Sequence, residues 1–399
     1  MKCVVHIGTE KTGTTSLQHF FSDNTEALLE RGLAYSAAFG RPTNRKLATI
    51  SMDPRQGDSS FVDHGLVTPA DHAAFREAVT ADFDAEVEAL KARGDVHTYF
   101  VSNEHLHSRL LTSEMVGSAA EVLRRKFSEI EVICFLRPQA DLALSCLSTS
   151  ARVGKQVTSE TYTTEGPYYD YLGLRERWVE LFGSIRLVPY KRHRDTIGWF
   201  LEHFGLERDG LTEPAGLNTA LDFRTVHLLS LVGPRVVGAQ LNLNRNVFLR
   251  EHAVEEPLSV DREMARQCQE RNHAANEALC ALTDDVTMDD LTPDFDRYPE
   301  TGNIHELDVD VAAAPRVNWL VVRFNAELSL ERANTRMAEA ELALEQGDRD
   351  RATRLLENAE KLIRQAADTG LEVPVRRAGW MGRKVQKMVR RLNRGGPAT

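Results

Sequence analysis

Two patterns of apolar and polar residues alternate along the first half of the chain. Short apolar runs, typical of buried strands, stand at residues 3–7, 98–102, 131–136 and 185–189. Between them, apolar residues recur every three or four positions, as on the buried face of a helix. Helices are predicted at residues 25–31, 69–93, 113–127, 139–149, 168–182 and 195–204. Strands separated by helices predict an α/β fold with a mostly parallel central sheet and helices on both faces.

The first strand leads into Gly-Thr-Glu-Lys-Thr-Gly-Thr-Thr-Ser, residues 8–16, and then into a helical pattern. Unpaired amides and a positive dipole at a helix start bind an anionic group without a metal. In the common nucleotide-triphosphate loop a lysine directly follows the second glycine, whereas here Lys11 precedes Gly13 and Thr14 follows it. Alternatively, Gly8 and Gly13 serve only a turn, and the threonines cap the helix.

A second motif follows the strand at residues 131–136. Arg137 stands at the end of this strand, and Ser145 lies eight residues later, about two turns into the next helix. A guanidinium forks onto phosphate oxygens, and a hydroxyl donates one more hydrogen bond. Taken alone, such an arginine is more often part of a surface ion pair and such a serine a packing residue. Together with the first loop, the two residues indicate a second anion site in the same crevice.

The run Lys-Thr-Gly-Thr-Thr at residues 11–15 resembles the 5′-phosphosulfate loop of sulfotransferases that use 3′-phosphoadenosine 5′-phosphosulfate (PAPS). In that family an arginine and a serine with the spacing of Arg137 and Ser145 bind the 3′-phosphate of the donor. The resemblance covers about residues 1–285 and implies a sulfotransferase domain with the P-loop NTPase-like fold of bacterial, carbohydrate-type enzymes. The donor-binding residues that it implies are Gly8, Thr9, Lys11, Thr12, Gly13, Thr14, Thr15, Ser16, Arg137 and Ser145.

The resemblance implies transfer of a sulfuryl group to a hydroxyl of a carbohydrate or glycolipid, without a metal, leaving adenosine 3′,5′-bisphosphate. The Lys11 ammonium is suited to neutralise charge on the leaving phosphate. Glu104, in the segment Ser-Asn-Glu-His-Leu-His directly after a strand, is the predicted base, and His105 and His107 are the alternatives. The polar segment at about residues 39–71 is interpreted as a long loop over the site or an acceptor-binding segment.

Composition limits where such a protein acts. The 399 residues are 42% hydrophobic and 27% charged, as in soluble globular proteins. The five cysteines include no Cys-x-x-Cys pair, so they indicate thiols of a reducing compartment and neither a zinc site nor a disulfide framework. We expect no signal peptide before the first strand, and no apolar run in the sequence approaches the roughly 18 residues of a membrane span. We expect a cytoplasmic protein, with the inner face of the membrane as an option.

The C-terminal part has a different character. An acidic segment at residues 286–325 is expected to wrap the core, and two helical patterns at residues 326–370 resemble one tetratricopeptide-like hairpin. Such a hairpin cannot bury its apolar face alone, so it should dock on the core or on a second subunit in a homodimer. Residues 373–399 hold eight Lys or Arg and no acid, which gives this segment a charge of +8. Because the net charge of the chain is −10, the other 372 residues together carry −18.

The basic tail, residues 371–399, reads as an amphipathic helix. Its apolar stripe consists of Met381, Val385, Met388, Val389 and Leu392. Most cations of residues 376–394 fall on the other side, and Trp380 stands at the start. Three interpretations stay open: shallow insertion of the stripe at a membrane surface, docking on the acidic body, and nucleic-acid binding. The acidic body argues against a nucleic-acid partner, which needs a contiguous positive surface.

Two other functional classes are alternatives to the sulfotransferase. A P-loop nucleotide kinase or NTPase would need a lysine after Gly13 and an acidic magnesium ligand at a strand end, and no apolar strand ends in a convincing aspartate. A non-catalytic, membrane-attached scaffold would have a degenerate loop. Intact Lys11, Arg137 and Ser145 weigh against that class.

Overall fold

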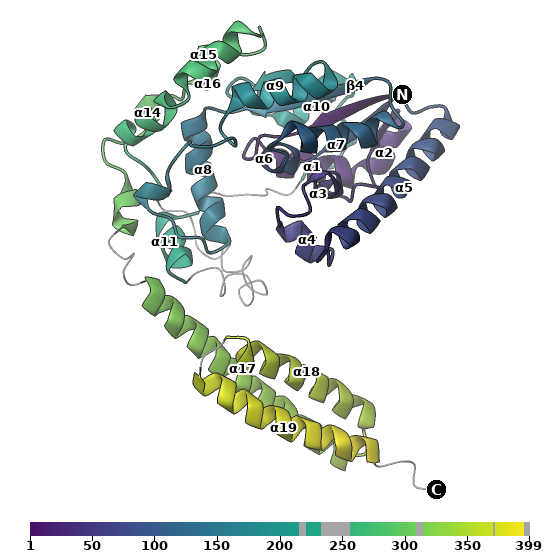
Figure 1. Cartoon of the computed structure of the whole chain (residues 1–399), viewed down its shortest axis with the longest axis vertical. Helices are drawn as coiled ribbons and strands as arrows, with labels where there is room; N and C mark the ends of the chain where they lie inside the picture. Colours follow the sequence, from purple (N-terminus) through teal and green to yellow (C-terminus); the bar gives the residue numbers. More distant parts are fainter. Residues whose placement is uncertain (215–220, 233–255, 309–313, 370–371, 395–399) are drawn as a thin grey trace. The chain divides into compact units, whose positions relative to one another are not determined.

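The chain forms two compact units in a computed structural model (Figure 1). The structure describes all residues except 215–220, 233–255, 309–313, 370–371 and 395–399. The first unit comprises Met1–Ser148, Ser159–Leu221 and Glu256–Ile304. The second comprises Thr149–Thr158, Asp222–Glu255 and His305–Thr399.

A parallel sheet forms the centre of the first unit. In the described part of the chain it has five strands: β1 (Lys2–His6), β2 (Leu33–Tyr35), β3 (Thr98–Ser102), β4 (Ile130–Leu136) and β5 (Arg186–Pro189). Their order is β2-β3-β1-β4-β5, and each neighbouring pair is parallel. The chain reaches β2 and β3 on one side of β1, and then β4 and β5 on the other. The carboxyl ends of β1, β3 and β4 therefore lie side by side where the direction of winding changes, which is where ligands of such sheets bind.

Both faces of the sheet are covered, as the alternation of side chains along β1 requires. Cys3 and Val5 pack into one apolar core, and Val4 packs into another on the opposite face. The first core is completed by α3 (Arg45–Ser51), α5 (Pro69–Arg93), α7 (Ser113–Arg124) and α9 (Tyr171–Phe182). The second core is completed by α1 (Thr14–Asp23), α2 (Thr25–Glu30) and α10 (Thr196–Phe204). The prediction of an α/β fold with a parallel sheet is confirmed.

Several predicted helix boundaries correspond to capping signals. Helix α5 begins after Thr68, whose hydroxyl accepts from the Asp71 amide in a capping box, and ends at Gly94 with φ 78°. The remaining helices of the first unit are α4 (Ser59–Asp63), α6 (His105–Arg109), α8 (Gln139–Arg152), α14 (Arg262–Glu270), α15 (His273–Ala281) and α16 (Met288–Leu291), of which α8 continues into the second unit.

The segment 39–71 is not the continuous loop that its polar composition predicts. It contains α3 and α4, and α3 buries Leu47 and Ile50 in the core beneath the sheet. A helix of seven residues completes fewer than two turns, so it shows little apolar periodicity. The segment therefore gains its shape from tertiary packing.

Long helices pack around a common core in the second unit. In its described part these are α17 (Ala314–Glu345), α18 (Arg349–Ala367) and α19 (Glu372–Arg394), beside α11 (Phe223–Val232). The predicted hairpin corresponds to α17 and α18, although α17 begins twelve residues before the predicted start at Ala326. Because Ala326, Leu330 and Met337 need apolar partners, α19 joins the hairpin and completes the core.

The apolar stripe of α19 is used inside this bundle. Met381, Val385 and Met388 are buried against α17 and α18. The predicted insertion of this stripe into a membrane is wrong for this structure, because these side chains are already covered. Among the described residues, no helix combines the length and the apolar composition needed to cross a bilayer.

Candidate functional site

The loop at residues 8–13 leaves the carboxyl end of β1, and α1 begins directly after it at Thr14. Gly13 is the N-cap residue, with φ 81° in the left-handed region that glycine adopts readily. Among the described residues, no side chain caps α1. The interpretation that the threonines cap this helix is therefore wrong, and the amides of its first turn remain at the positive end of the helix dipole.

Gly8 and Thr9 extend the pairing of β1 with β4. The Thr9 amide donates to the Phe135 carbonyl over 2.8 Å, and the Phe135 amide donates to the Gly8 carbonyl over 2.6 Å. A Cβ atom on Gly8 would lie 3.1 Å from the Cα atom of Glu104, so glycine allows the loops after β1 and β3 to approach. These two predicted donor-binding residues thus position the loop through their backbone.

Two of the predicted hydroxyl ligands are directed to the loop itself. The Thr12 hydroxyl donates to the Thr9 carbonyl over 2.7 Å, and the Thr14 hydroxyl donates to the same oxygen over 3.3 Å. A phosphate oxygen only accepts, so a hydroxyl whose hydrogen is already donated offers it nothing. Thr12 and Thr14 therefore shape the loop with their side chains. Thr15 and Ser16, which are half-buried on the first turn of α1, are the better hydroxyl candidates.

Arg137 lies against this loop. Its Nη1 atom donates to the Lys11 carbonyl over 3.3 Å, and the Tyr171 hydroxyl donates to the Arg137 carbonyl over 2.6 Å. Both Lys11 and Arg137 are half-buried. The structure thus brings the two predicted cations, 126 positions apart in the sequence, to one place beside the start of α1.

Ser145 lies on α8 and is half-buried. The neighbouring residue, Cys146, shows that this part of α8 is near the cations: burial raises the pKa of its thiol to about 11, and Lys11 and Arg137 act against that rise. No described contact joins Ser145 itself to the loop, so its role in anion binding stays a prediction.

Glu104 follows β3 and holds the N-cap position of α6, yet among the described residues its side chain makes no cap hydrogen bond. Instead the Gln18 amide donates to the Glu104 Oε2 atom over 2.6 Å and to the Ser102 carbonyl over 3.1 Å. Because Gln18 belongs to α1, the carboxylate is fixed beside the helix that follows the loop. Gln18 was not predicted; its only sequence signal is a polar side chain next to the buried positions Leu17 and Phe20.

The two histidines after Glu104 lie in different surroundings. His107 is fully buried against the Tyr168 ring, with 4.9 Å between ring centroids, and burial lowers its pKa to about 4. His105 is half-buried, and burial is also the main cause of its lowered pKa. A base must reach the proton that it abstracts, so burial disfavours His107 as the catalytic base. Glu104 is the better-placed candidate.

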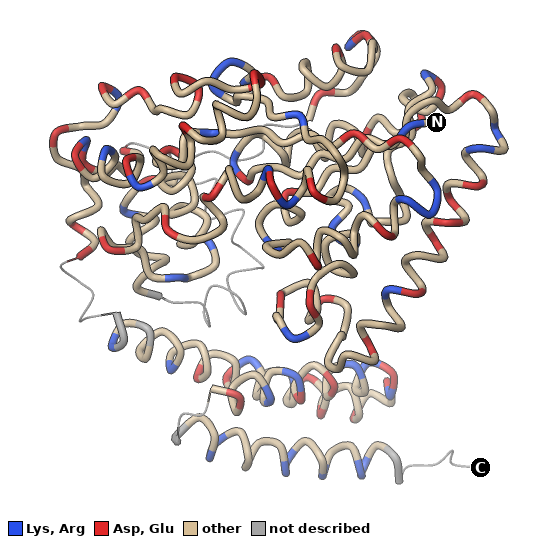
Figure 2. The backbone as a smooth tube through the Cα atoms, turned by 45° about the horizontal axis from the view of Figure 1, so that its top comes forward, with Lys and Arg blue, Asp and Glu red and all other residues tan. Residues whose placement is uncertain are grey.

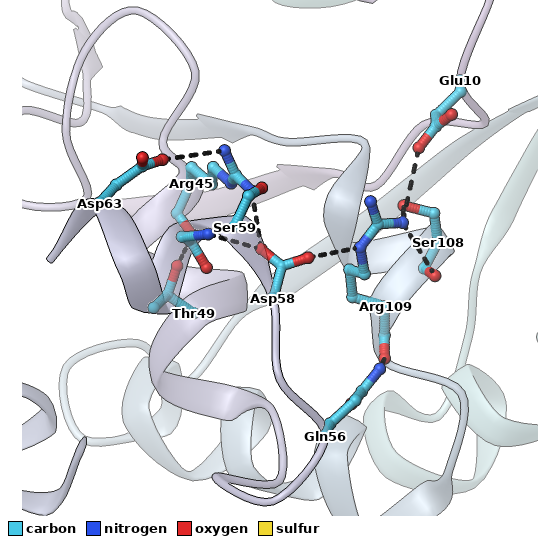
Figure 3. A network of polar contacts seen from close by, with 10 residues as sticks. Glu10, Arg45, Thr49, Gln56, Asp58, Ser59, Asp63, Ser108 and Arg109 are labelled. Carbon is cyan, nitrogen blue, oxygen red and sulfur yellow. Dashed lines mark hydrogen bonds and ion pairs between the residues drawn. The ribbon is translucent and has the colours of Figure 1, made fainter. Parts of the chain in front are cut away.

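A chain of alternating charges joins the loop to the segment 39–71 (Figure 3). The Asp58 carboxylate accepts from Arg45 Nη2 over 2.7 Å and from Arg109 Nε over 2.9 Å. Arg109 Nη1 also lies 3.9 Å from Glu10 Oε1, and Glu10 is a loop residue next to Lys11. Burial alone would raise the pKa of Asp58, but the Ser60 amide and the two guanidinium groups outweigh it and hold the pKa below its ordinary value.

A separate hollow of about 680 Å³ lies among α14, α15 and α16. Its lining includes Gln269 and Asn276, which both hydrogen-bond the buried Gln139 side chain at the start of α8. None of the predicted site residues lines this hollow. The Gln269 and Asn276 side-chain amides are thus engaged with Gln139, and the hollow is separate from the predicted site at the loop.

Comparison with family models, with curated proteins and with solved structures found no match to this chain.

Proposed function

We propose that this protein transfers a sulfuryl group from PAPS to a hydroxyl of a carbohydrate or glycolipid acceptor. The observation that carries the proposal is the meeting of three strand ends at one place. The uncapped start of α1 follows β1, Arg137 follows β4 and contacts the Lys11 carbonyl, and Glu104 follows β3 and is held by Gln18. Anion-binding groups and a carboxylate thus stand side by side.

The donor set fits an anion with charge at two ends. The amides of the first turn of α1, with the Thr15 and Ser16 hydroxyls, would hold the 5′-phosphosulfate end. Arg137 would hold the 3′-phosphate through its guanidinium, with Ser145 adding a hydroxyl. Because Lys11 and Arg137 are half-buried, their charges are less screened than those of fully exposed cations.

The residues of the site also supply what the transfer requires. When bound, the donor provides an SO₃ unit attached to a phosphate leaving group. Glu104 takes the proton of the acceptor hydroxyl, and because Gln18 occupies Oε2, the Oε1 atom is the one that receives it. Lys11 neutralises the charge that remains on the phosphate after the S–O bond to it breaks. Positioning of the acceptor in line with that bond supplies the rest of the barrier reduction.

The competing nucleotide kinase or NTPase is less well supported. Thr14 stands where such a protein needs its lysine, and the Thr14 hydroxyl is directed to the Thr9 carbonyl. A non-catalytic scaffold would not require a carboxylate at this place, whereas Gln18 holds the Glu104 carboxylate beside the loop.

Titration calorimetry with adenosine 3′,5′-bisphosphate and a chelator tests the donor site. We expect metal-independent binding that Arg137→Ala weakens by about tenfold or more, the loss typical of a charge-assisted hydrogen bond. Arg55→Ala is the matched control, because the ion pair that the described residues give Arg55 is with the neighbouring Asp53 at the surface. Tighter binding of ATP with Mg²⁺ would overturn the proposal in favour of a kinase or NTPase. Incubation with labelled donor and envelope extracts then identifies the acceptor class.

A further inference from the structure

The outward face of α19 carries a continuous row of cations. Its members recur at spacings of three or four residues, so they share one side of the helix. The exposed side chains on this side, here called the basic stripe, are the cations Arg376, Arg383, Lys387, Arg390 and Arg391 together with Trp380. Beyond Glu372 at its start, α19 contains no acid, and Figure 2 shows Lys and Arg along its length.

Packing of the bundle fixes the direction of this stripe. Met381, Val385 and Met388 point into the core shared with α17 and α18, so the opposite side of α19 faces outward. Within the described part of the chain, Arg383 and Lys387 have no carboxylate within ion-pair distance. Arg377, which lies off the stripe, behaves differently and pairs with Glu327 of α17 over 2.8 Å.

Exposed apolar side chains lie close to one end of the stripe. Leu320, Phe324 and Leu328 recur every four residues on α17, and Phe324 is 69% exposed. The ion pair between Arg377 and Glu327 places this part of α17 beside the first turns of α19, where Trp380 is 57% exposed. Cations and apolar groups are thus combined on one unit.

We propose that this surface binds the anionic face of a lipid bilayer. Anionic headgroups attract Lys and Arg, while tryptophan and short apolar groups favour the interface between water and acyl chains. Nucleic acid would account for the cations but not for Leu320 and Phe324. A second copy of the chain would account for the apolar side chains, but it would set like charges of the basic stripe against each other. The contacting face is the basic one, opposite to the stripe in the bundle core.

Co-sedimentation of the full-length protein with vesicles tests this proposal. We expect binding to phosphatidylcholine vesicles that contain phosphatidylglycerol, loss of binding at high salt, and no binding to pure phosphatidylcholine. The triple variant Arg383→Glu, Lys387→Glu, Arg390→Glu should bind at least about tenfold more weakly. Its matched control is Arg354→Glu, Lys361→Glu, Arg364→Glu, which makes the same charge change on exposed positions of α18 and should bind as the unaltered protein does.

Circular dichroism and thermal melts show whether both triple variants are folded, and Trp380→Ala gives a second measurement. This variant keeps every charge, so a weaker vesicle affinity reports the interfacial tryptophan alone.

Equal binding to neutral vesicles, or unchanged binding by the stripe variant, overturns the proposal. Absence of vesicle binding together with salt-sensitive DNA or RNA binding assigns the stripe to nucleic acid instead. A dimer in sedimentation that Phe324→Ala dissolves, without vesicle binding, assigns the surface to a second copy.

Discussion

At the scale of single residues, the loop after β1 is governed by close approaches. Gly13 combines a positive φ with a lack of space, because a Cβ atom there would lie 2.8 Å from the Thr196 hydroxyl of α10. The Thr12 and Thr14 hydroxyls bind the Thr9 carbonyl from within the loop. The shape of the loop thus depends on contacts that leave the first-turn amides of α1 for a ligand.

Gly13→Ala should therefore damage both stability and donor binding. The left-handed conformation costs a residue with a Cβ about 1–2 kcal/mol, and the contact with Thr196 adds to it. Gly183→Ala is the matched control, since Gly183 has φ 84° and no described atom within 4 Å of the added Cβ. Urea unfolding should show a loss in both variants, whereas calorimetry should show weaker bisphosphate binding only for Gly13→Ala. Equal bisphosphate affinities in the two variants would contradict the assigned role of the loop.

Glu104→Gln should separate chemistry from donor binding. Glutamine keeps the shape of the side chain but cannot accept the acceptor proton, so kcat should fall by roughly 10²–10⁴ while bisphosphate affinity stays unchanged. Glu114→Gln, at an exposed position of α7, serves as the control and should keep full turnover. Full activity of Glu104→Gln would show that Glu104 is not the base, and His105 would then be the leading candidate.

His107 should make the protein less stable in acid. Its pKa is lowered from 6.5 to about 4 in the folded state, so between these values the unfolded chain binds the extra proton. Stability is then complete above pH 6.5 and declines as the pH falls toward 4, by up to ~1.4 kcal/mol per pH unit for one group. His107→Phe should show a correspondingly smaller slope in urea unfolding over that range. An unchanged slope would mean that His107 is not the buried neutral group described above.

At the scale of secondary-structure elements, the short helices α3 and α4 are tied to the loop by charge. Asp58 stands before α4, and its side chain is 9% exposed while it accepts from Arg45 and Arg109. Arg109 belongs to α6 and also approaches Glu10. The segment predicted to cover the site or contact the acceptor is thus linked by ion pairs to Glu10 of the loop after β1.

Removal of Arg109 should cost more than removal of an exposed arginine. Arg109→Gln leaves Asp58 with one cationic partner, and loss of a hydrogen bond to a charged, mostly buried group costs about 1–3 kcal/mol. Arg55→Gln, at an exposed ion pair, should cost less than about 1 kcal/mol. Both values come from urea unfolding.

A double variant tests whether Arg109 and Asp58 act in one network. The loss in free energy of unfolding for Arg109→Gln with Asp58→Asn should be smaller than the sum of the losses for the two single variants. Additive losses would show that the network does not act as a unit.

At the scale of the whole molecule, the strand order explains why distant residues share a site. β1 lies between β3 and β4, so the loops at Lys11, Glu104 and Arg137 emerge at neighbouring strand ends. In the second unit, α17 and α18 together present an apolar face, and α19 covers it. The cations of the basic stripe then remain at the surface of this unit.

The sequence alone determined the elements whose signals are local. The strand, loop and helix of residues 2–23, and α5 between its capping box and Gly94, follow from periodicity and from cap residues a few positions apart. The sequence also placed Lys11 and Arg137 at strand ends and marked the tail as amphipathic.

Only the tertiary structure decided which faces and side chains meet. The contact of Gln18 with Glu104 and the strand order that unites the site join residues that are far apart in the chain. The burial of the α19 stripe against α17 and α18 was decided in the same way. The hydrophobic effect favours the covering of an apolar stripe but does not depend on what covers it. From the sequence alone, a membrane, the body of the protein and a neighbouring helix are therefore equally good partners.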